Sequence, residues 1–529
     1  MPTRDIEDSK NVLAIDLGSG GPKVGLVDRD GRVLTSASRD TTIHFLPNGG
    51  AEQEPDEWWS TIVDSVHEVI KESGVPRESI IAVGCTSQFS VIVPVDENGE
   101  ALMNAVHWLD TRGSPYNRSL LKGFPSIQGF GLQKFLIWMQ RAGMPPTLSG
   151  ADSLGHILFI KNEMPEIYRK TYKFLEPMDY LNLRLTGKCA STLNTVFPYV
   201  LSDNRNLNGM DYDQRLLEIA GIDKGKLPEI LPIDGVVGQI RPSIADELGL
   251  STDTKVICGV NDNSTSAIGS GAVEDFDTVA VLGNSGYLAC HLPFKKTDIT
   301  SFITTMPSGI PGRYLIFAEL GNNGKVLDSY LNNLVFCKDE FGETDSSSEL
   351  YKKLNKIIEQ VPPGSEGVLF LPWFRGTFAP SEDQYVRGGF LNLTHRTTRA
   401  HLTRSVLEGI TFNWKWLREP AEKFIGRKYE SWRISGGGAL SDAWVQIMAD
   451  VVGIPMQQVE HPRLGNVRGI AFLAFNRLGL LSLDEIPSKV KITKTFEPRE
   501  EYKEIYDKLY QQFLSSFRKI TPIFHALNK

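Results

Sequence analysis

Apolar and small residues follow the same arrangement at two places in the chain. The apolar runs 12–15 and 24–27 flank a glycine-rich loop, and the runs 278–282 and 287–292 flank a second one. Short apolar runs separated by Gly and Ser are typical of strands joined by a tight turn. The sequence therefore predicts two strand–loop–strand units, one near the start of each half.

Longer segments carry the periodicity of helices. Their apolar side chains recur every three or four residues, which places them on one helix face. The predicted helices are 54–73, 402–417, 444–452 and 502–513. Further buried strands are predicted at 80–84, 90–95, 256–260 and 432–435. The helix at 444–452 has Ser441 and Asp442 as candidate N-caps.

The length of the chain predicts more than one domain. Its 529 residues exceed what one ordinary hydrophobic core organises. We place the boundary between domains 1–255 and 256–529, after the Pro-, Asp- and Gly-rich stretch 228–242. The polar run 339–348 is expected to be a surface loop.

Composition and charge exclude several classes of protein. A net charge of -8 and a pI near 5.7 argue against a bulk nucleic-acid binder. The polar start 1–10 lacks the apolar core of a signal peptide, and no run approaches the ~20 apolar residues of a membrane span. Five cysteines without a C-x-x-C pair suggest reduced thiols, and the nine histidines are not spaced for structural zinc. We expect a cytoplasmic protein that binds neither nucleic acid nor a membrane.

Three glycine-rich loops are candidates for binding phosphate or a nucleotide. Backbone N–H groups at 18–21 and 283–286 could point at phosphate oxygens. Lys23 would add positive charge, and Asp16 at a strand end could hold Mg²⁺, usually through water. The triplet 436–438 before a helix could let a flat base lie against the backbone. Plain turns would explain the first two loops taken singly, whereas the triplet 436–438 opens an amphipathic helix, which favours a function there; the joint occurrence of the loops strengthens this interpretation.

Three polar positions could contact a substrate. Asp262, after a buried strand, could accept a proton from an alcohol, or it could cap a helix beginning at Ser264. Asp110 could bind polyol hydroxyls or form a surface ion pair with Arg112. Gln88 could contact a sugar or satisfy the bend that carries it. For Asp110 and Gln88 taken alone, the structural alternative is the more frequent one.

The order and spacing of eight motifs resemble the FGGY family of carbohydrate kinases, and the resemblance covers nearly the whole chain. The motifs lie at 14–19 with Lys23, 52–59, 86–88, 108–112, 259–263, 370–373, 387–409 and 435–439. The nearest branch looks xylulokinase-like. The resemblance implies an α/β fold with two ribonuclease-H-like (actin-like ATPase) domains, and a cleft between them that takes ATP and a sugar.

The resemblance also implies a role for each matching residue. Asp262 matches the catalytic base that deprotonates the acceptor hydroxyl, and Asp16 matches the carboxylate associated with Mg²⁺. The residues implied in ATP binding are Gly18, Ser19, Gly20, Lys23, Gly283, Asn284, Ser285, Gly286, Gly437, Gly438 and Ala439. The residues implied in sugar contacts are Gln88, Phe89, Asp110, Asp262 and Asn263.

The chain departs from the xylulokinase pattern at three places. Phe89-Ser90 stands where Met-His is usual, Asn284 where Thr is usual, and Leu440 where Lys is common. The leading hypothesis is ATP- and Mg²⁺-dependent phosphorylation of a hydroxyl of a small sugar or polyol, such as the pentulose xylulose or a related ketose. The alternative is a non-catalytic sugar- or nucleotide-binding regulator on the same fold. Either could assemble as a homodimer.

Overall fold

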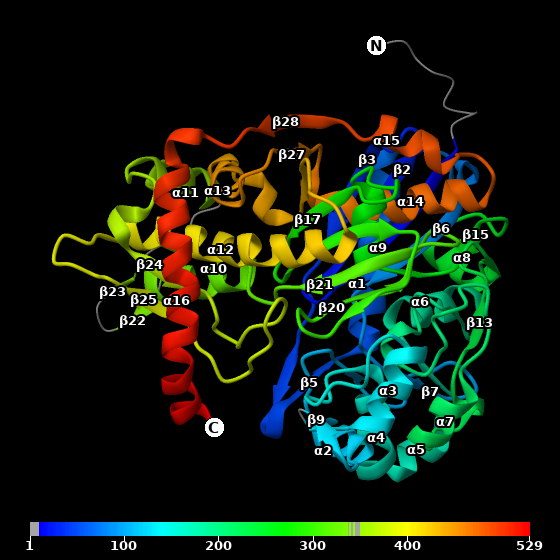
Figure 1. Cartoon of the computed structure of the whole chain (residues 1–529). Coiled ribbons are helices and arrows are strands. Elements are labelled where there is room, and N and C mark those ends of the chain that lie inside the picture. Colours follow the sequence, from blue (N-terminus) through cyan, green and yellow to red (C-terminus); the bar gives the residue numbers. More distant parts are fainter. Residues whose placement is uncertain (1–9, 128, 337, 340–341, 344–349) are drawn as a thin grey trace.

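The computed structural model describes residues 10–127, 129–336, 338–339, 342–343 and 350–529. Most of the run 339–348, predicted to be a surface loop, lies outside these residues. Two large sheets with surrounding helices make up the described chain (Figure 1). None of the described helices is both long and apolar enough to cross a membrane. The four described cysteines carry free thiols, and Cys337 lies outside the described residues.

The first sheet has the strand order β14-β15-β6-β1-β2-β3, with β16 also paired to β6. Strands β1, β2 and β3 run antiparallel, whereas β1, β6 and β15 are parallel neighbours. The edge strand β14 is antiparallel to β15. The strands are β1 (Asn11–Gly18), β2 (Gly21–Asp28), β3 (Val33–Ser38), β6 (Ile80–Ser87), β14 (Val236–Gln239), β15 (Lys255–Ile257) and β16 (Val260–Asn261).

The second sheet repeats this arrangement in the order β19-β20-β21-β18-β17-β26-β27-β28. Strands β17, β18 and β21 are antiparallel, β17, β26 and β27 are parallel neighbours, and β28 is an antiparallel edge. The strands are β17 (Thr278–Leu282), β18 (Gly286–Leu292), β19 (Thr297–Asp298), β20 (Ile303–Pro307), β21 (Tyr314–Glu319), β26 (Trp432–Ser435), β27 (Met456–Val459) and β28 (Ile492–Phe496). Two ribonuclease-H-like domains therefore make up the fold, as the sequence predicts.

The four predicted helical segments correspond to α1, α12, α13 and α16. The helices of the first half are α1 (Pro55–Ser73), α2 (Ser114–Leu121), α3 (Leu132–Arg141), α4 (Ser153–Glu163), α5 (Pro165–Lys170), α6 (Pro177–Thr186), α7 (Gln214–Ala220) and α8 (Pro242–Leu248). In the second half they are α9 (Asp262–Gly269), α10 (Gly324–Tyr330), α11 (Leu350–Glu359), α12 (Arg399–Ile425), α13 (Asp442–Val452), α14 (Gly465–Arg477), α15 (Ile486–Lys489) and α16 (Lys503–Asn528). Ser441 caps α13 by accepting a hydrogen bond from the Trp444 N–H, as predicted.

Short strands form small additional sheets. They are β4 (His44–Leu46), β5 (Gly50–Gln53), β7 (Val93–Val95), β8 (Ala105–Val106), β9 (Ser126–Ile127), β10 (Phe130–Gly131), β11 (Lys173–Leu175), β12 (Ala190–Thr192), β13 (Glu229–Leu231), β22 (Lys338–Asp339), β23 (Gly342–Glu343), β24 (Leu369–Leu371) and β25 (Gly389–Leu391). Of these, the β4–β5 hairpin extends away from the first sheet (Figure 1).

The chain passes from one sheet to the other later than residue 255. The expected boundary falls inside β15, which pairs with β6, and β16 prolongs the first sheet as far as Asn261. Helix α9 follows directly, and the second sheet begins at Thr278. The first residue of α9, Asp262, therefore stands where the first sheet ends.

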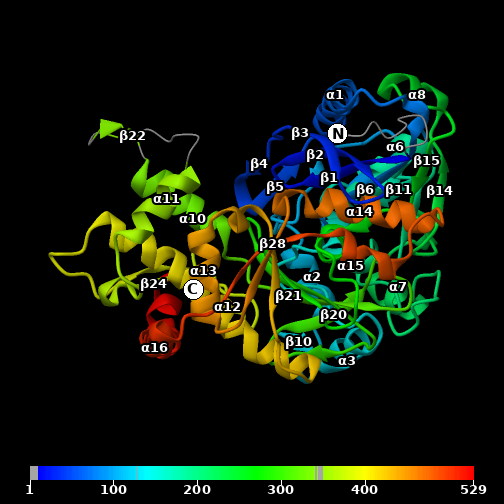
Figure 2. The ribbon, with the colours of Figure 1, turned by 90° about the horizontal axis from the view of Figure 1, so that it is seen from above.

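Helix α14, although late in the sequence, packs on the first domain. It contacts α9, β1 and β6 (Figure 2). Its apolar side chains share a buried cluster with one face of the first sheet, including Val12, Ala14, Ala82, Ile257, Val467, Ile470 and Phe472. A Cβ added at Gly469 would collide with the Thr265 carbonyl, and one at Gly269 with the Gly465 carbonyl. Helices α9 and α14 therefore meet backbone to backbone.

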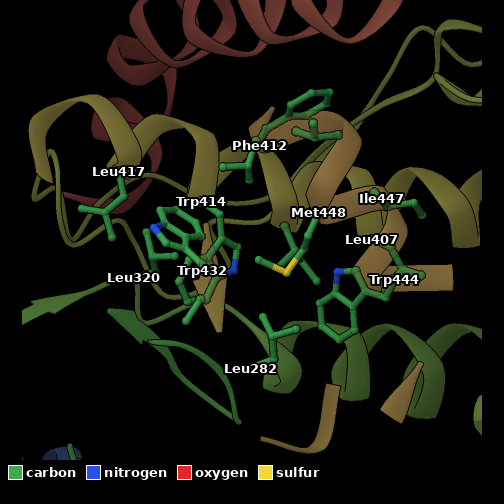
Figure 3. Packing of buried hydrophobic residues seen from close by; sticks show 14 of the residues in the cluster. Leu282, Leu320, Leu407, Phe412, Trp414, Leu417, Trp432, Trp444, Ile447 and Met448 are labelled. Atoms are coloured by element: carbon green, nitrogen blue, oxygen red, sulfur yellow. The ribbon is translucent and has the colours of Figure 1, made fainter. Parts of the chain in front are cut away.

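The core of the second domain is rich in tryptophan (Figure 3). The rings of Trp414 and Trp432 lie 6.1 Å apart, and Trp444 packs in the same cluster. Leu282, the last residue of β17, is 1% exposed within this core. The glycine loop that follows Leu282 is thus anchored on close-packed aromatic side chains.

Candidate active site

The first glycine loop is a two-residue hairpin between β1 and β2. Gly18 pairs with Gly21, so Ser19 and Gly20 form its tip. Gly21 has φ +124°, and a Cβ there would collide with the Arg39 carbonyl, so only glycine fits. The loop therefore presents bare backbone at the end of two buried strands.

The same two strands bring a carboxylate and an ammonium group together. Asp16 on β1 lies opposite Lys23 on β2, and the Lys23 Nζ is 3.3 Å from an Asp16 oxygen. Asp16 is only 2% exposed. A second contact comes from the start of α14, where the Asn466 amide lies 3.4 Å from both Asp16 oxygens. The carboxylate is thus held in one orientation.

The second and third glycine loops touch each other. The tip 283–285 joins β17 to β18, and the Gly283 carbonyl accepts hydrogen bonds from the Gly324 N–H at 3.0 Å and the Asn323 amide at 2.8 Å. Gly436 has φ +90°, and a Cβ on it would stand 2.7 Å from the Leu282 carbonyl oxygen. The backbones of these two loops, which are far apart in sequence, therefore lie against each other.

The third loop continues into a short 3-10 helix, Gly437–Leu440, ahead of α13. Gly438 and Ala439 are buried there, whereas Leu440 is 42% exposed. A Cβ at Gly465, the first residue of α14, would lie 2.9 Å from the Ser435 hydroxyl at the end of β26. The first two residues of α14 therefore contact both regions: Gly465 lies against the end of β26 before the third loop, and Asn466 contacts Asp16.

Asp262 opens α9 immediately after β16. The capping role considered for Asp262 belongs instead to Asn261, whose Oδ1 accepts the Ser264 N–H at 3.0 Å. The Oδ1 atom of Asp262 is buried and has no hydrogen-bond partner among the described residues. Asp262 therefore does not cap α9, which was the structural alternative to a role as a base.

The surroundings of Asp262 favour its protonated form. Burial raises its pKa to about 8, the charges of Asp16 and Glu319 act in the same direction, and the Asn263 N–H and Lys23 oppose them. Glu319 ends β21 next to the second loop, where burial raises its own pKa while a hydrogen bond with Ser285 and the charge of Arg375 lower it. A carboxylate with a pKa near 8 binds a proton more strongly than an ordinary carboxylate and can act as a base once it is deprotonated.

The predicted sugar contact Gln88 lies against the first glycine loop. Its Oε1 accepts a hydrogen bond from the Ser19 hydroxyl at 2.6 Å, and its amide donates to Gln53 at 2.7 Å. The Trp108 indole donates to the same Ser19 oxygen at 2.9 Å. Residues predicted for phosphate and for sugar therefore belong to one hydrogen-bond network.

The bend after Gln88 is held in place by contacts with buried side chains. Phe89 packs edge-on against Phe317 of β21, with ring centroids 6.0 Å apart. Ser90 has φ +59°, and its carbonyl is 3.1 Å from His156 Nε2. The Glu176 carboxylate accepts the Val91 N–H at 3.2 Å, and burial raises its pKa well above the usual range. The residues replacing Met-His thus sit in a rigid bend.

Asp110 forms the ion pair with Arg112 that was one of its two interpretations, although its carboxylate is buried and Arg112 is partly exposed. Its Oδ2 accepts the Ala51 N–H at 2.9 Å and the Arg112 Nε at 2.8 Å. Arg112 also donates to Glu52 at 2.6 Å. The sugar contact inferred for Asp110 stays a prediction, as does that of Asn263, which is buried next to Asp262.

Four residues near the site were not singled out from the sequence: Asn323, Glu319, Arg375 and Asn466. Glu319 had a usable signal, because it follows the apolar run of β21 as Asp16 follows the apolar run 12–15 of β1. The other three carry no local signal of their own. Asn466 reaches Asp16 across 450 residues of sequence, and only the folded chain brings them together.

The residues at the site fit a magnesium ion that arrives with a nucleotide. Within the described part of the chain, no group of three or more His, Cys, Asp or Glu side chains could hold a metal by itself. Mg²⁺ is usually bound by one or two carboxylates together with substrate phosphates and water. The single, oriented carboxylate of Asp16 beside the glycine loops matches that donor set.

Known proteins resemble the chain over almost all of its length. A xylulose kinase of Staphylococcus epidermidis is 27% identical over 514 residues, which is 96% of this chain and 96% of the relative. A gluconokinase of Bacillus subtilis is 26% identical over 449 residues, covering 83% of this chain and 82% of the relative. The crystal structure of a gluconate kinase from Lactobacillus acidophilus shares the fold with a TM-score of 0.83, at 23% identity, over 98% of this chain and 100% of the other.

Family models match each domain separately. The N-terminal domain of the FGGY family of carbohydrate kinases matches residues 11–269, and its C-terminal domain matches residues 278–476. The first match ends with α9, and the second begins with β17. The expected resemblance is confirmed, and the chain belongs to the FGGY family of carbohydrate kinases, with xylulokinase-like relatives.

Proposed function

We propose that the protein transfers the γ-phosphoryl group of ATP, with Mg²⁺, to a hydroxyl of a pentulose such as xylulose or of a related ketose. The observation that carries the proposal is Asp262, a carboxylate with an unpartnered buried oxygen and a pKa raised to about 8. The charges of Asp16 and Lys23 both act on its pKa, and it opens α9, the helix between the last strand of the first sheet and the first residues of the second. Relatives that are xylulose kinases support a pentulose as the acceptor.

Asp262 is proposed as the general base. Its carboxylate takes the proton of the acceptor hydroxyl while the hydroxyl oxygen bonds to the γ-phosphorus and the bond to the ADP oxygen breaks. Phosphoryl transfer needs positioning and charge neutralisation more than covalent help. Lys23 and the backbone N–H groups of the two hairpin loops are the groups proposed for that task.

Asp16 is proposed as the carboxylate that holds Mg²⁺. Lys23 and Asn466 keep its oxygens oriented, at 3.3 and 3.4 Å. When bound with the nucleotide, Mg²⁺ would spread the negative charge of the phosphates. The glycine loops 283–286 and 436–438 are proposed to take the phosphates and the adenosine, with Gln88, Phe89, Asp110 and Asn263 on the sugar side.

A coupled assay of ADP release with ketoses, aldoses, polyols and sugar acids tests the proposal. We expect turnover stimulated by xylulose or a related ketose, and a loss of about 10²–10⁴-fold in Asp262→Ala. Asp253→Ala, at an exposed turn far from the site chemistry, is the matched control and should keep wild-type turnover.

Three outcomes would contradict the proposal. Unchanged turnover in Asp262→Ala would reject this residue as the base. ADP release that ignores every acceptor would indicate an ATPase. Acceptor binding without any turnover would favour the regulator class. The homodimer stays a prediction, which light scattering of the purified chain would check.

A further inference from the structure

The strand that follows the second hairpin, β18, divides its side chains between two buried clusters. Leu288 packs in the tryptophan-rich core of the second domain, whereas its neighbours Tyr287 and Ala289 pack in a smaller cluster. Successive side chains of a strand point to opposite faces of the sheet, which accounts for this division. The smaller cluster also contains Ala267 of α9, and α9 packs against β18. Tyr287 therefore faces the helix that begins with the proposed base, Asp262.

The Tyr287 hydroxyl bonds to α9 near its start. Tyr287 is 8% exposed, and its hydroxyl donates to the Ser266 Oγ at 3.3 Å. The Ser266 hydroxyl in turn donates to the Asn263 carbonyl at 2.8 Å. Asn263 directly follows Asp262 in the chain. Two hydrogen bonds in series therefore connect the strand after the second hairpin to the residue beside the proposed base.

The register of the second sheet agrees with this placement. Tyr287 of β18 is paired with Glu319 of β21, and directly paired residues of antiparallel strands project on the same side of a sheet. Since the Tyr287 side chain reaches α9, Glu319 also projects from the face that α9 covers. The influence of the Glu319 charge on Asp262 is consistent with this arrangement.

The first domain holds the same helix at the neighbouring residue. The Thr265 hydroxyl lies 3.0 Å from the Thr86 hydroxyl of β6. The Thr265 carbonyl lies where a Cβ on Gly469 of α14 would collide with it. Two consecutive residues of α9 are thus bonded to different sheets, Thr265 to the first and Ser266 to the second. Contacts from both sheets therefore determine where Asp262 lies.

We infer that Tyr287 is a positioning residue for Asp262: its hydroxyl, through Ser266, fixes the base relative to the hairpin that is proposed to bind phosphate. This inference rests on the proposed function. The base, the acceptor hydroxyl and the phosphoryl group must be aligned for transfer, and a misplacement of about 1 Å can cost as much as 10²-fold in rate. Tyr287 acts through the helix and is not itself proposed to touch ATP or the acceptor.

Steady-state kinetics of Tyr287→Phe test the inference, because this change removes the hydroxyl and keeps the aromatic ring. We expect kcat to fall about tenfold, whereas the KM values for ATP and for the acceptor stay within about twofold of wild type. Ser266→Ala removes the other partner of the hydrogen bond and should lower kcat to a similar extent. It also keeps the test available if Tyr287→Phe does not fold.

Tyr330→Phe is the matched control. Tyr330 is 1% exposed in the same domain, and its hydroxyl lies 3.0 Å from the Thr403 hydroxyl. This variant should lose about as much thermal stability as Tyr287→Phe and keep the wild-type kcat. An equal fall of kcat in the two variants would overturn the inference, because the loss of any buried tyrosine hydroxyl would then explain the effect.

The double variant Tyr287→Phe/Ser266→Ala separates one shared contact from two independent effects. If the two hydroxyls act through their mutual hydrogen bond, kcat of the double variant should fall no further than kcat of the more affected single variant. Losses that multiply to about hundredfold would overturn the inference. So would an unchanged kcat in Tyr287→Phe, or a KM for ATP that rises as much as kcat falls, because Tyr287 would then support only the hairpin.

Hydrogen exchange of the α9 backbone keeps the test decisive if turnover is absent. If wild type shows no turnover with any acceptor, the proposed function fails separately. Tyr287→Phe should still speed exchange of the amides 264–267 about tenfold, because the start of α9 opens more easily without the bond to Ser266. Tyr330→Phe should leave these amides unchanged. Equal exchange in wild type and Tyr287→Phe would overturn the inference.

Discussion

The two glycine hairpins occupy the same place in two sheets of the same order, yet they present different chemistry. The β1–β2 hairpin carries charges on its own strands, Asp16 and Lys23. The strands of the β17–β18 hairpin carry no Asp, Glu, Lys or Arg, and the carboxylate beside its tip, Glu319, comes from β21. The two equivalent hairpins thus differ in what they offer a ligand. The first carries charged side chains, and the second offers mainly backbone groups.

Removing the charge of the first hairpin should have the largest effect. Asp16→Ala is expected to lower kcat by about 10²–10³-fold, because the proposed site would lose its only carboxylate held by Lys23 and Asn466. Ser285→Ala in the second hairpin is the paired comparison and should cost less than tenfold. Kinetics at saturating ATP and acceptor measure both. Equal losses in the two variants would remove the proposed division between charge and backbone.

Crowding the backbone of the second hairpin should have the next largest effect. Gly436→Ala places a Cβ 2.7 Å from the Leu282 carbonyl at φ +90°, so the second and third loops must move apart. We expect ADP affinity to fall about tenfold and unfolding to become easier by about 1–3 kcal/mol. Calorimetry and thermal unfolding measure these changes.

Gly426→Ala is the matched control for this substitution. Gly426 also has a positive φ, +77°, but a Cβ there would meet nothing within 4 Å. It should lose some stability and keep ADP affinity. An equal loss of ADP affinity in both variants would show that backbone strain elsewhere in this domain also weakens ADP binding. The contact between the second and third loops would then have no specific role.

The pH dependence of turnover should report the charges of the first hairpin. A base must be deprotonated, so kcat/KM should rise with pH until it levels off above the pKa of Asp262, which is about 8. Lys23 lowers that pKa, so Lys23→Gln should move the rise toward higher pH. Initial rates from pH 6 to 9.5 measure the shift. An unchanged profile would mean that Lys23 does not act on Asp262, and a shift toward lower pH would contradict the sign of the proposed interaction.

The smallest effect is expected for a side chain of the second hairpin. The Asn284 carbonyl accepts the Lys325 N–H at 3.0 Å, a contact that any side chain at this position can keep. Asn284→Thr should therefore change the KM for ATP by less than about threefold. A tenfold change would show that this hairpin acts through a side chain after all.

The sequence predicts those features that depend only on residues close together in the chain. Apolar runs around small residues predict both hairpins, since a strand pattern and a turn need only neighbouring residues. Asp262 was identified from its place after a buried strand, although Asn261, and not Asp262, proved to be the helix cap. The resemblance to known motifs supplied the roles that local patterns could not.

The rest depends on packing between distant segments. The placement of β15 and β16 follows from pairing with β6, more than 160 residues earlier, so a composition change at 228–242 does not reveal where the first sheet ends. The sequence pattern suggested a surface ion pair for Asp110, but its carboxylate is buried and accepts the Ala51 N–H of β5. Asn323, Arg375 and Asn466 reach the site from separate elements, and no spacing rule connects them to it.

Helix α14 has a consequence for the biosynthesis of the chain. Its side chains cover one apolar face of the first sheet, which otherwise is built almost entirely from residues before 262. During translation α14 can cover that face only after residues 465–477 of the 529 have been synthesised. The first domain therefore cannot complete its hydrophobic core without α14. A product truncated before α14 would expose an apolar, aggregation-prone sheet surface and would not be a smaller stable protein.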